Sequence, residues 1–196
     1  SRLDMRYYRY ADDFVILTRR RETAEALHCP VSAELNEDLQ LEIHPPSEKT
    51  GVRNLSDEGL DFVGFHFTVT GVKVRMETVE RFKGRFTEAL GREPDLKSRS
   101  NHWSTRLGLA IRWCINPKIT GPIPRRCEKC GLPTEARRSW MACFAPAVTD
   151  VRQLKELDRW MRKQVYKHFR DRYRVRVDRR YLRKIGMKSL VGEYHR

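Results

Sequence analysis

The chain has 196 residues, of which 39% are hydrophobic and 34% are charged, and its formal net charge is +14. This composition is typical of a soluble globular protein with one or two domains, and it excludes disordered, collagen-like and disulfide-rich secreted chains. The sequence contains no apolar run of the roughly 18 residues that a membrane span needs, so we expect no membrane partner.

The first predicted element is a β-hairpin near the N-terminus. Residues 6–10 are rich in tyrosine, and residues 14–17 form a continuous apolar run, so both segments favour strands. A short connection between two strands makes a hairpin. We therefore expect the adjacent carboxylates of Asp12 and Asp13 at a hairpin tip. The residues before this hairpin carry neither an initiator methionine nor a secretory pattern, so we expect a piece of a longer protein.

The next segment shows helical spacing and then alternation. Apolar residues recur at three- and four-residue steps from about residue 22 to residue 39, and Pro30 predicts a kink or two short helices. Alternation then predicts strands, which we expect over residues 39–43, 60–69 and 72–75.

From residue 76 onward the apolar period is helical. Helices are predicted over residues 79–90, 103–114, 151–169 and 182–194. Asp150 and Gln153 resemble a capping box at the start of the third helix. The expected fold class is α+β, with an antiparallel sheet and a packed helix in residues 1–75 and a helical domain in residues 76–196. A cysteine-containing insert is expected at about residues 114–143.

The positive charge is concentrated in the second part of the chain. Residues 1–75 contain 10 Lys and Arg against 13 Asp and Glu, a net charge of −3, whereas residues 76–196 contain 30 against 13, a net charge of +17. Such a basic region indicates a polyanion partner, most often nucleic acid. The alternative is a solvated surface without a partner.

The hairpin tip is the strongest chemical signal. Two adjacent carboxylates repel each other unless a positive charge lies beside them, and their hard oxygens suit Mg²⁺. The alternative is an ordinary aspartate-rich surface turn.

Four ordered segments resemble one family. Residues 9–17 (Arg-Tyr-Ala-Asp-Asp-Phe-Val-Ile-Leu) closely resemble the palm signature of reverse transcriptases, in particular those of group II introns and their bacterial relatives. Residues 41–42 and 47–50 resemble the family's lysine loop, and Phe-Val-Gly-Phe at 62–65 resembles its primer-grip hairpin. Residues 157–163 resemble the conserved helix of its thumb, or maturase, region.

The resemblance implies an RNA-directed DNA polymerase. In that family a primer 3′-hydroxyl attacks the α-phosphate of a deoxynucleotide triphosphate on an RNA template, with two Mg²⁺ ions. The implied partners are therefore the RNA template, the DNA primer, the nucleotides and, in an intron host, the intron RNA. The implied location is the bacterial cytoplasm.

The resemblance also implies roles for single residues. Asp12 would bind the catalytic Mg²⁺, and Asp13 would support the same site. Tyr10 and Ala11 would lie under the primer end or the incoming nucleotide. Lys49 would lie near the nucleotide phosphates, although it could equally be a solvated loop lysine. The primer strand would be positioned by Phe62, Gly64 and Phe65, for which plain sheet packing is the alternative.

The sequence also departs from the family pattern. The third catalytic carboxylate and the fingers, which precede the palm signature in the family, do not precede it here. We therefore expect the 196 residues to be inactive by themselves. Two alternatives remain open at this point. One is a non-catalytic RNA-binding maturase or scaffold, and the other is a reverse transcriptase that serves antiphage defence or CRISPR adaptation.

Cysteines suggest a structural zinc site. Cys127 and Cys130 form a Cys-x-x-Cys pair, with Cys114 thirteen residues before it and Cys143 thirteen residues after it. Four thiolates can bind Zn²⁺ tetrahedrally. The alternative is reduced thiols, because we expect a reducing compartment.

Basic helices complete the candidate sites. Phosphate contacts by Lys and Arg give affinity without reading the base sequence. The residues expected to make them, on an RNA–DNA hybrid or a structured RNA, are Arg81, Lys83, Arg85, Arg159, Arg162, Lys163 and Lys167.

Overall fold

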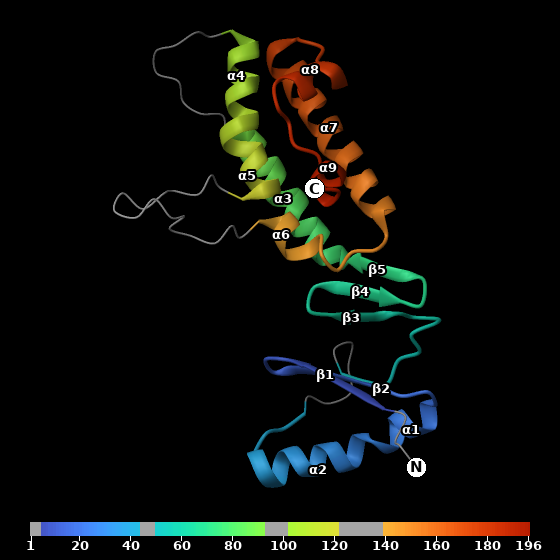
Figure 1. Ribbon diagram of the computed structural model, residues 1–196. Coiled ribbons are helices and arrows are strands. Elements are labelled where there is room, and N and C mark those ends of the chain that lie inside the picture. Colours follow the sequence, from blue (N-terminus) through green and yellow to red (C-terminus); the bar gives the residue numbers. More distant parts are fainter. Residues whose placement is uncertain (1–4, 44–49, 93–101, 122–138) are drawn as a thin grey trace, which may run out of the picture. The chain divides into compact units, whose positions relative to one another are not determined.

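The computed structural model describes residues 5–43, 50–92, 102–121 and 139–196 (Figure 1). The chain forms two compact units, unit 1 (residues 1–70) and unit 2 (residues 71–196). The coarse expectation of a mixed α and β chain with antiparallel strands and several helices is confirmed.

Unit 1 begins with an antiparallel hairpin. Strands β1 (Arg6–Tyr10) and β2 (Asp13–Leu17) pair with Tyr10 opposite Asp13. The turn therefore consists of Ala11 and Asp12 alone, and Asp13 is already the first residue of β2. This register places both carboxylates at one end of the hairpin.

Two helices follow, which is one of the two outcomes expected from Pro30. Helix α1 (Arg21–Ala26) ends at Leu27, and α2 (His28–Leu39) begins directly after it. Pro30 lies in the first turn of α2, where its missing N–H costs little, whereas it would break a continuous helix. The strand expected over residues 39–43 is wrong. Gln40 ends α2 in a left-handed conformation with φ 53°, and the residues that follow up to Ile43 are irregular.

A second hairpin replaces the long strand expected over residues 60–69. Strands β3 (Leu60–Phe62) and β4 (Phe65–Thr68) pair with Phe62 opposite Phe65. The two turn residues, Val63 and Gly64, have φ angles of 50° and 83°. Two successive positive φ angles match the twist of a two-residue hairpin, so this turn folds the run back on itself.

The described residues of unit 2 form one strand and a set of helices around a common core. Its elements are β5 (Gly71–Val74), α3 (Met76–Gly91), α4 (Trp103–Leu109), the π-helix η1 (Ala110–Ile115), α5 (Asn116–Thr120), α6 (Trp140–Phe144), α7 (Val151–Tyr173), α8 (Arg179–Lys184) and α9 (Leu190–Tyr194). Phe86, Ile111, Met161, Phe169 and Leu190 are fully buried where these helices meet. Among the described residues, every buried hydrophobic side chain lies in unit 2.

Several predicted bounds in unit 2 need correction. The helix expected to end before Asn116 continues through η1 into α5 and stops at Gly121. The wide π turn precedes Pro117, which has no N–H to donate to the preceding turn. The helix expected over residues 182–194 is two helices, because Gly186 has φ 83°.

The unit boundary lies before β5, whereas the sequence pattern places the domain boundary after residue 75. The backbone of Val72 explains the position of β5. Its N–H donates to Thr149 Oγ1 (2.8 Å), and its carbonyl accepts from the backbone N–H groups of Thr149 (3.0 Å) and Asp150 (3.2 Å). Strand β5 is therefore bonded to the segment that starts α7.

None of the helices in the described part of the chain combines the length and apolarity that a membrane crossing requires.

Candidate functional site

The turn between β1 and β2 is held in an uncommon conformation. Ala11 has φ 54°, a value that a residue with a Cβ adopts at a cost of roughly 1–2 kcal/mol. Arg9 stabilises the turn, because its Nε donates a 2.7 Å hydrogen bond to the carbonyl of Ala11. Backbone strain of this kind is concentrated at functional sites. The turn therefore fixes the direction in which the following carboxylates leave the backbone.

Both carboxylates at the tip are open to a ligand. Asp12 and Asp13 are exposed. Neither makes an ion pair or a side-chain hydrogen bond with another residue in the described ranges. Unpaired carboxylate oxygens suit a hard cation, so the two aspartates fit a Mg²⁺ ion. Mg²⁺ prefers six oxygen ligands, and within the described residues no group of three or more metal-ligating side chains is formed. Two aspartates alone are an incomplete set.

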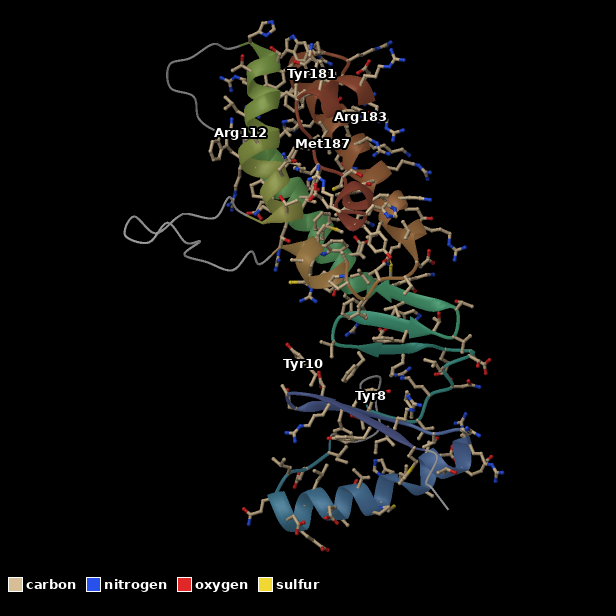
Figure 2. All side chains as sticks on the ribbon, viewed as in Figure 1. Tyr8, Tyr10, Arg112, Tyr181, Arg183 and Met187 are labelled. Carbon is tan, nitrogen blue, oxygen red and sulfur yellow. The ribbon has the colours of Figure 1, made fainter. Side chains whose placement is uncertain are left out.

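An aromatic face lies next to the tip. Tyr8 and Tyr10 are two residues apart on β1, so they lie on the same face of the hairpin (Figure 2). Their side chains are 48% and 62% exposed. Exposed tyrosines next to carboxylates offer stacking surfaces for nucleotide bases.

The second hairpin carries the residues expected to hold a primer. Phe62 and Phe65 close the turn as a cross-strand pair and are half-buried, with Gly64 between them. Phe65 also contacts Phe67, with 6.1 Å between ring centroids. Gly64 is required by its φ of 83°. The phenylalanines thus have a packing role that does not depend on a primer.

Two of the expected site features extend beyond the described residues. Lys49, Cys127 and Cys130 lie outside them. Of the remaining cysteines, Cys143 is exposed on α6. The thiol of Cys114 donates to the carbonyl of Arg92 at 3.2 Å, an arrangement that needs no metal.

Helix α7 presents a continuous cationic face. Arg159, Lys163 and Lys167 follow at four-residue steps and are exposed, and Arg162 is half-buried beside them. None of these four cations pairs with a carboxylate among the described residues. The opposite face of α7, which includes Leu157 and Met161, is buried. The helix therefore separates a core face from a face that is free to contact phosphates.

Helix α3 does not present a matching face. Lys83 is bonded to Glu80 at 2.6 Å and lies 5.7 Å from the ring centre of Trp160 on α7. Arg81 and Arg85, four residues apart, lie on the other side of the helix, because a step of two residues turns it by about 200°. The three cations expected on α3 therefore do not lie on one face of the helix.

The basic C-terminal stretch of the sequence contributes a second group of cations beside α7. Arg179, Arg183 and Lys188 line a cavity together with Arg162 of α7. The four-residue spacing of Arg179 and Arg183 places both on one side of α8, which begins after the N-cap Asp178. The cavity that they share with Arg162 could not be found from the sequence.

A scan against protein-family models finds no match for this chain, and a search of curated proteins finds no significantly similar relative.

Proposed function

We propose that the chain is the C-terminal part of the palm and the thumb of an RNA-directed DNA polymerase, a reverse transcriptase of the group II intron type. The observation that carries the proposal is the hairpin tip, where a strained two-residue turn presents two exposed, unpaired carboxylates next to an exposed tyrosine face. The proposed partners are an RNA template, a DNA primer and deoxynucleotide triphosphates. The proposed location is the bacterial cytoplasm.

The residues at the tip have distinct roles in this proposal. Asp12 and Asp13 would hold Mg²⁺, which when bound supplies positive charge for the primer hydroxyl and the nucleotide phosphates. Arg9 keeps the turn in shape through its bond to Ala11. Tyr10 offers a flat surface on which a base of the primer or the nucleotide can stack. A further carboxylate, from outside this pair, is needed to complete the metal site.

Unit 2 supports the same proposal through its charge. Arg159, Lys163 and Lys167 follow one another at four-residue steps along α7, and none of them makes an ion pair within the described residues. Such a face binds a phosphate backbone without base recognition, as a polymerase that moves along its template requires. Unit 2 would hold the RNA–DNA hybrid by its backbone.

A second candidate is an RNA-binding scaffold without catalysis. It is favoured by one observation, that the described residues provide two carboxylates and no third metal ligand beside them. In this candidate α7 binds structured RNA and the hairpin tip has no chemical role.

Primer extension tests both candidates. The Asp12→Asn variant of the longer protein should lose extension of a DNA primer on an RNA template, while its affinity for the RNA–DNA hybrid stays within about twofold. Asp57→Asn, which also removes an exposed carboxylate from unit 1, is the matched control and should extend normally. Extension by Asp12→Asn at the rate of the control would overturn the polymerase proposal. Tight RNA binding without extension by the unmodified protein would favour the scaffold.

A further inference from the structure

A basic cavity lies in unit 2 beside α7. It has a volume of about 250 Å³, and its walls come from α7, α8 and the segment before α9. The charged residues of the lining are Asp158, Arg162, Arg179, Arg183 and Lys188. A water molecule takes up about 30 Å³ in the liquid, so the cavity has room for a tetrahedral oxyanion and some bound water. Arg183 and Met187, which lie on this wall, are labelled in Figure 2.

The carboxylate in the lining, that of Asp158, already accepts hydrogen bonds from the start of α9. Asp158 is 4% exposed, and its oxygens accept from Ser189 Oγ (2.5 Å), Leu190 N (2.8 Å) and Val191 N (3.2 Å). These bonds fix the start of α9 against α7. The carboxylate therefore has a structural role, and it makes no ion pair with the arginines of the lining.

Within the described ranges, the arginines of the cavity have no anionic partner. Arg162, Arg179 and Arg183 make no ion pair with any residue that the structure describes, whereas Lys188 pairs with Glu193 at 3.3 Å. Arginine stays charged at every physiological pH. Guanidinium groups around one cavity repel each other, and a bound anion removes this repulsion.

Part of the backbone that lines the cavity is held in place by hydrogen bonds from another helix. Asn116 of α5 donates to the carbonyl of Gly186 (2.9 Å) and accepts from the backbone N–H of Lys188 (2.9 Å). Arg179 and Arg183 lie on one side of α8, because residues four apart are neighbours on a helix. Two guanidinium groups at neighbouring positions of one helix can bind one phosphate through paired hydrogen bonds.

We propose that this cavity is a phosphate-binding pocket, which holds one phosphate group of a nucleic-acid strand through Arg162, Arg179 and Arg183. The nucleic-acid identity of the ligand rests on the proposed function, whereas the anion chemistry rests on the cavity alone. The phosphate is either an internal phosphodiester or a terminal monophosphate of the strand. The pocket would fix the position of one phosphate, which the open face of α7 by itself does not do.

Charge-matched variants of α8 test the pocket. The first variant is Arg179→Gln with Arg183→Gln. The control is Arg180→Gln with Lys184→Gln, which removes the same charge from exposed positions of α8 outside the cavity lining. Binding of a labelled RNA–DNA hybrid by the full chain is measured by fluorescence anisotropy. Since hydrogen bonds to charged groups are strong, the pocket variant should bind at least about tenfold more weakly than the control. Circular dichroism verifies that both variants fold.

The outcomes separate the pocket from the proposed function. If both variants lose the same affinity, the loss comes from the change in net charge alone. The pocket is then refuted, while nucleic-acid binding stands. Titration with inorganic phosphate gives an independent measurement, in which the control should bind and the pocket variant should not. A chain that binds phosphate there but no hybrid would keep the anion pocket and overturn both the proposed function and the nucleic-acid ligand. Tighter binding of 5′-phosphorylated than 5′-hydroxyl strands, lost in the pocket variant, assigns the site to a strand end. Equal binding assigns it to an internal phosphodiester.

Discussion

The side-chain amide of Gln153 pairs with the backbone of Val74, 79 residues earlier in the chain. Its Oε1 accepts from Val74 N at 2.8 Å, and its Nε2 donates to Val74 O at 2.7 Å. The amide thus makes the same two hydrogen bonds to Val74 that a neighbouring strand would make. Val74 is buried, so water cannot replace these bonds. The capping box expected for Gln153 is not formed, since Asp150 caps α7 by accepting from Arg152 N.

Replacement of Gln153 by alanine should destabilise unit 2. Val74 is 1% exposed, so its N–H and carbonyl would both be left without partners. Each buried unsatisfied group costs about 1–3 kcal/mol, so we expect a loss of about 2 kcal/mol or more in the free energy of unfolding. Urea denaturation measures it. Gln164→Ala on the same helix is the control, and equal losses in the two variants would contradict the role of Gln153.

Asp158 should be essential for the docking of α9. Alanine at this position leaves the buried N–H of Leu190 without its acceptor and removes the bond from Ser189. Hydrogen bonds to charged groups contribute more than neutral ones, so we expect a loss of about 3 kcal/mol. Thermal unfolding provides the measurement. Asp171→Ala, which removes an exposed carboxylate of α7, should change the stability by less than about 1 kcal/mol.

The lowered pKa of Asp150 predicts that the free energy of unfolding depends on pH in the acid range. The hydrogen bond from Arg152 is the main reason why the pKa of Asp150 is lowered to about 2, and Lys73 adds a smaller contribution. A carboxyl group with a lowered pKa in the folded state stabilises the fold above its unfolded pKa, and this stabilisation is lost as the pH falls. The free energy of unfolding should therefore fall between about pH 4 and pH 2. Asp150→Asn keeps a good N-cap residue without the charge, so its decrease over this range should be shallower. Chemical denaturation at several pH values provides the comparison, and parallel curves would contradict the assignment.

The cationic face of α7 predicts salt-dependent binding. If unit 2 neutralises about six phosphates, the affinity for an RNA–DNA hybrid should fall roughly a thousandfold between 50 and 200 mM salt. Replacement of Arg159, Arg162 and Lys163 by glutamine should lower the slope by up to about three, one for each lost phosphate contact.

The control for this slope removes the same charge from cations that already have partners. Arg92, Arg152 and Arg196 are paired with Glu88, Asp150 and Glu193. Their replacement by glutamine should leave the slope nearly unchanged. If the two triple variants gave the same slope, only the net charge of the chain would matter for binding. The face of α7 would then have no specific role.

The cysteines predict one zinc ion per chain. If Cys114, Cys127, Cys130 and Cys143 converge, elemental analysis of the purified protein should find about one equivalent of zinc. Serine at positions 127 and 130 should abolish it, whereas serine at the exposed Cys29 should not. Zinc-free protein whose stability does not depend on Cys127 and Cys130 would leave these residues as ordinary thiols.

Local signals in the sequence were sufficient for the first hairpin and for the main helices. The tyrosine-rich and apolar runs around Asp12 predict two strands, and a connection this short leaves a hairpin as the simplest geometry. The four- and three-residue spacing of Leu154, Leu157 and Met161 predicts α7 in the same way, because one helix face must be buried. The strand expected over residues 39–43 failed because alternation over a few residues is a weak signal beside a helix that ends in a left-handed residue.

The sequence by itself determined which residues of this protein carry charge, which faces are apolar and where the carboxylate pair stands on its hairpin. Charge follows from residue type alone, and apolar faces and short turns depend on residues that are only a few positions apart in the sequence. Only the tertiary structure decided that Gln153 bonds to Val74, that Asp158 holds α9, and that Arg162 shares a cavity with Arg179 and Arg183. Polar side chains that serve distant backbone groups leave no periodic pattern in the sequence. Their partners are set by how the helices pack, since a buried polar group must be satisfied by whatever the fold brings beside it.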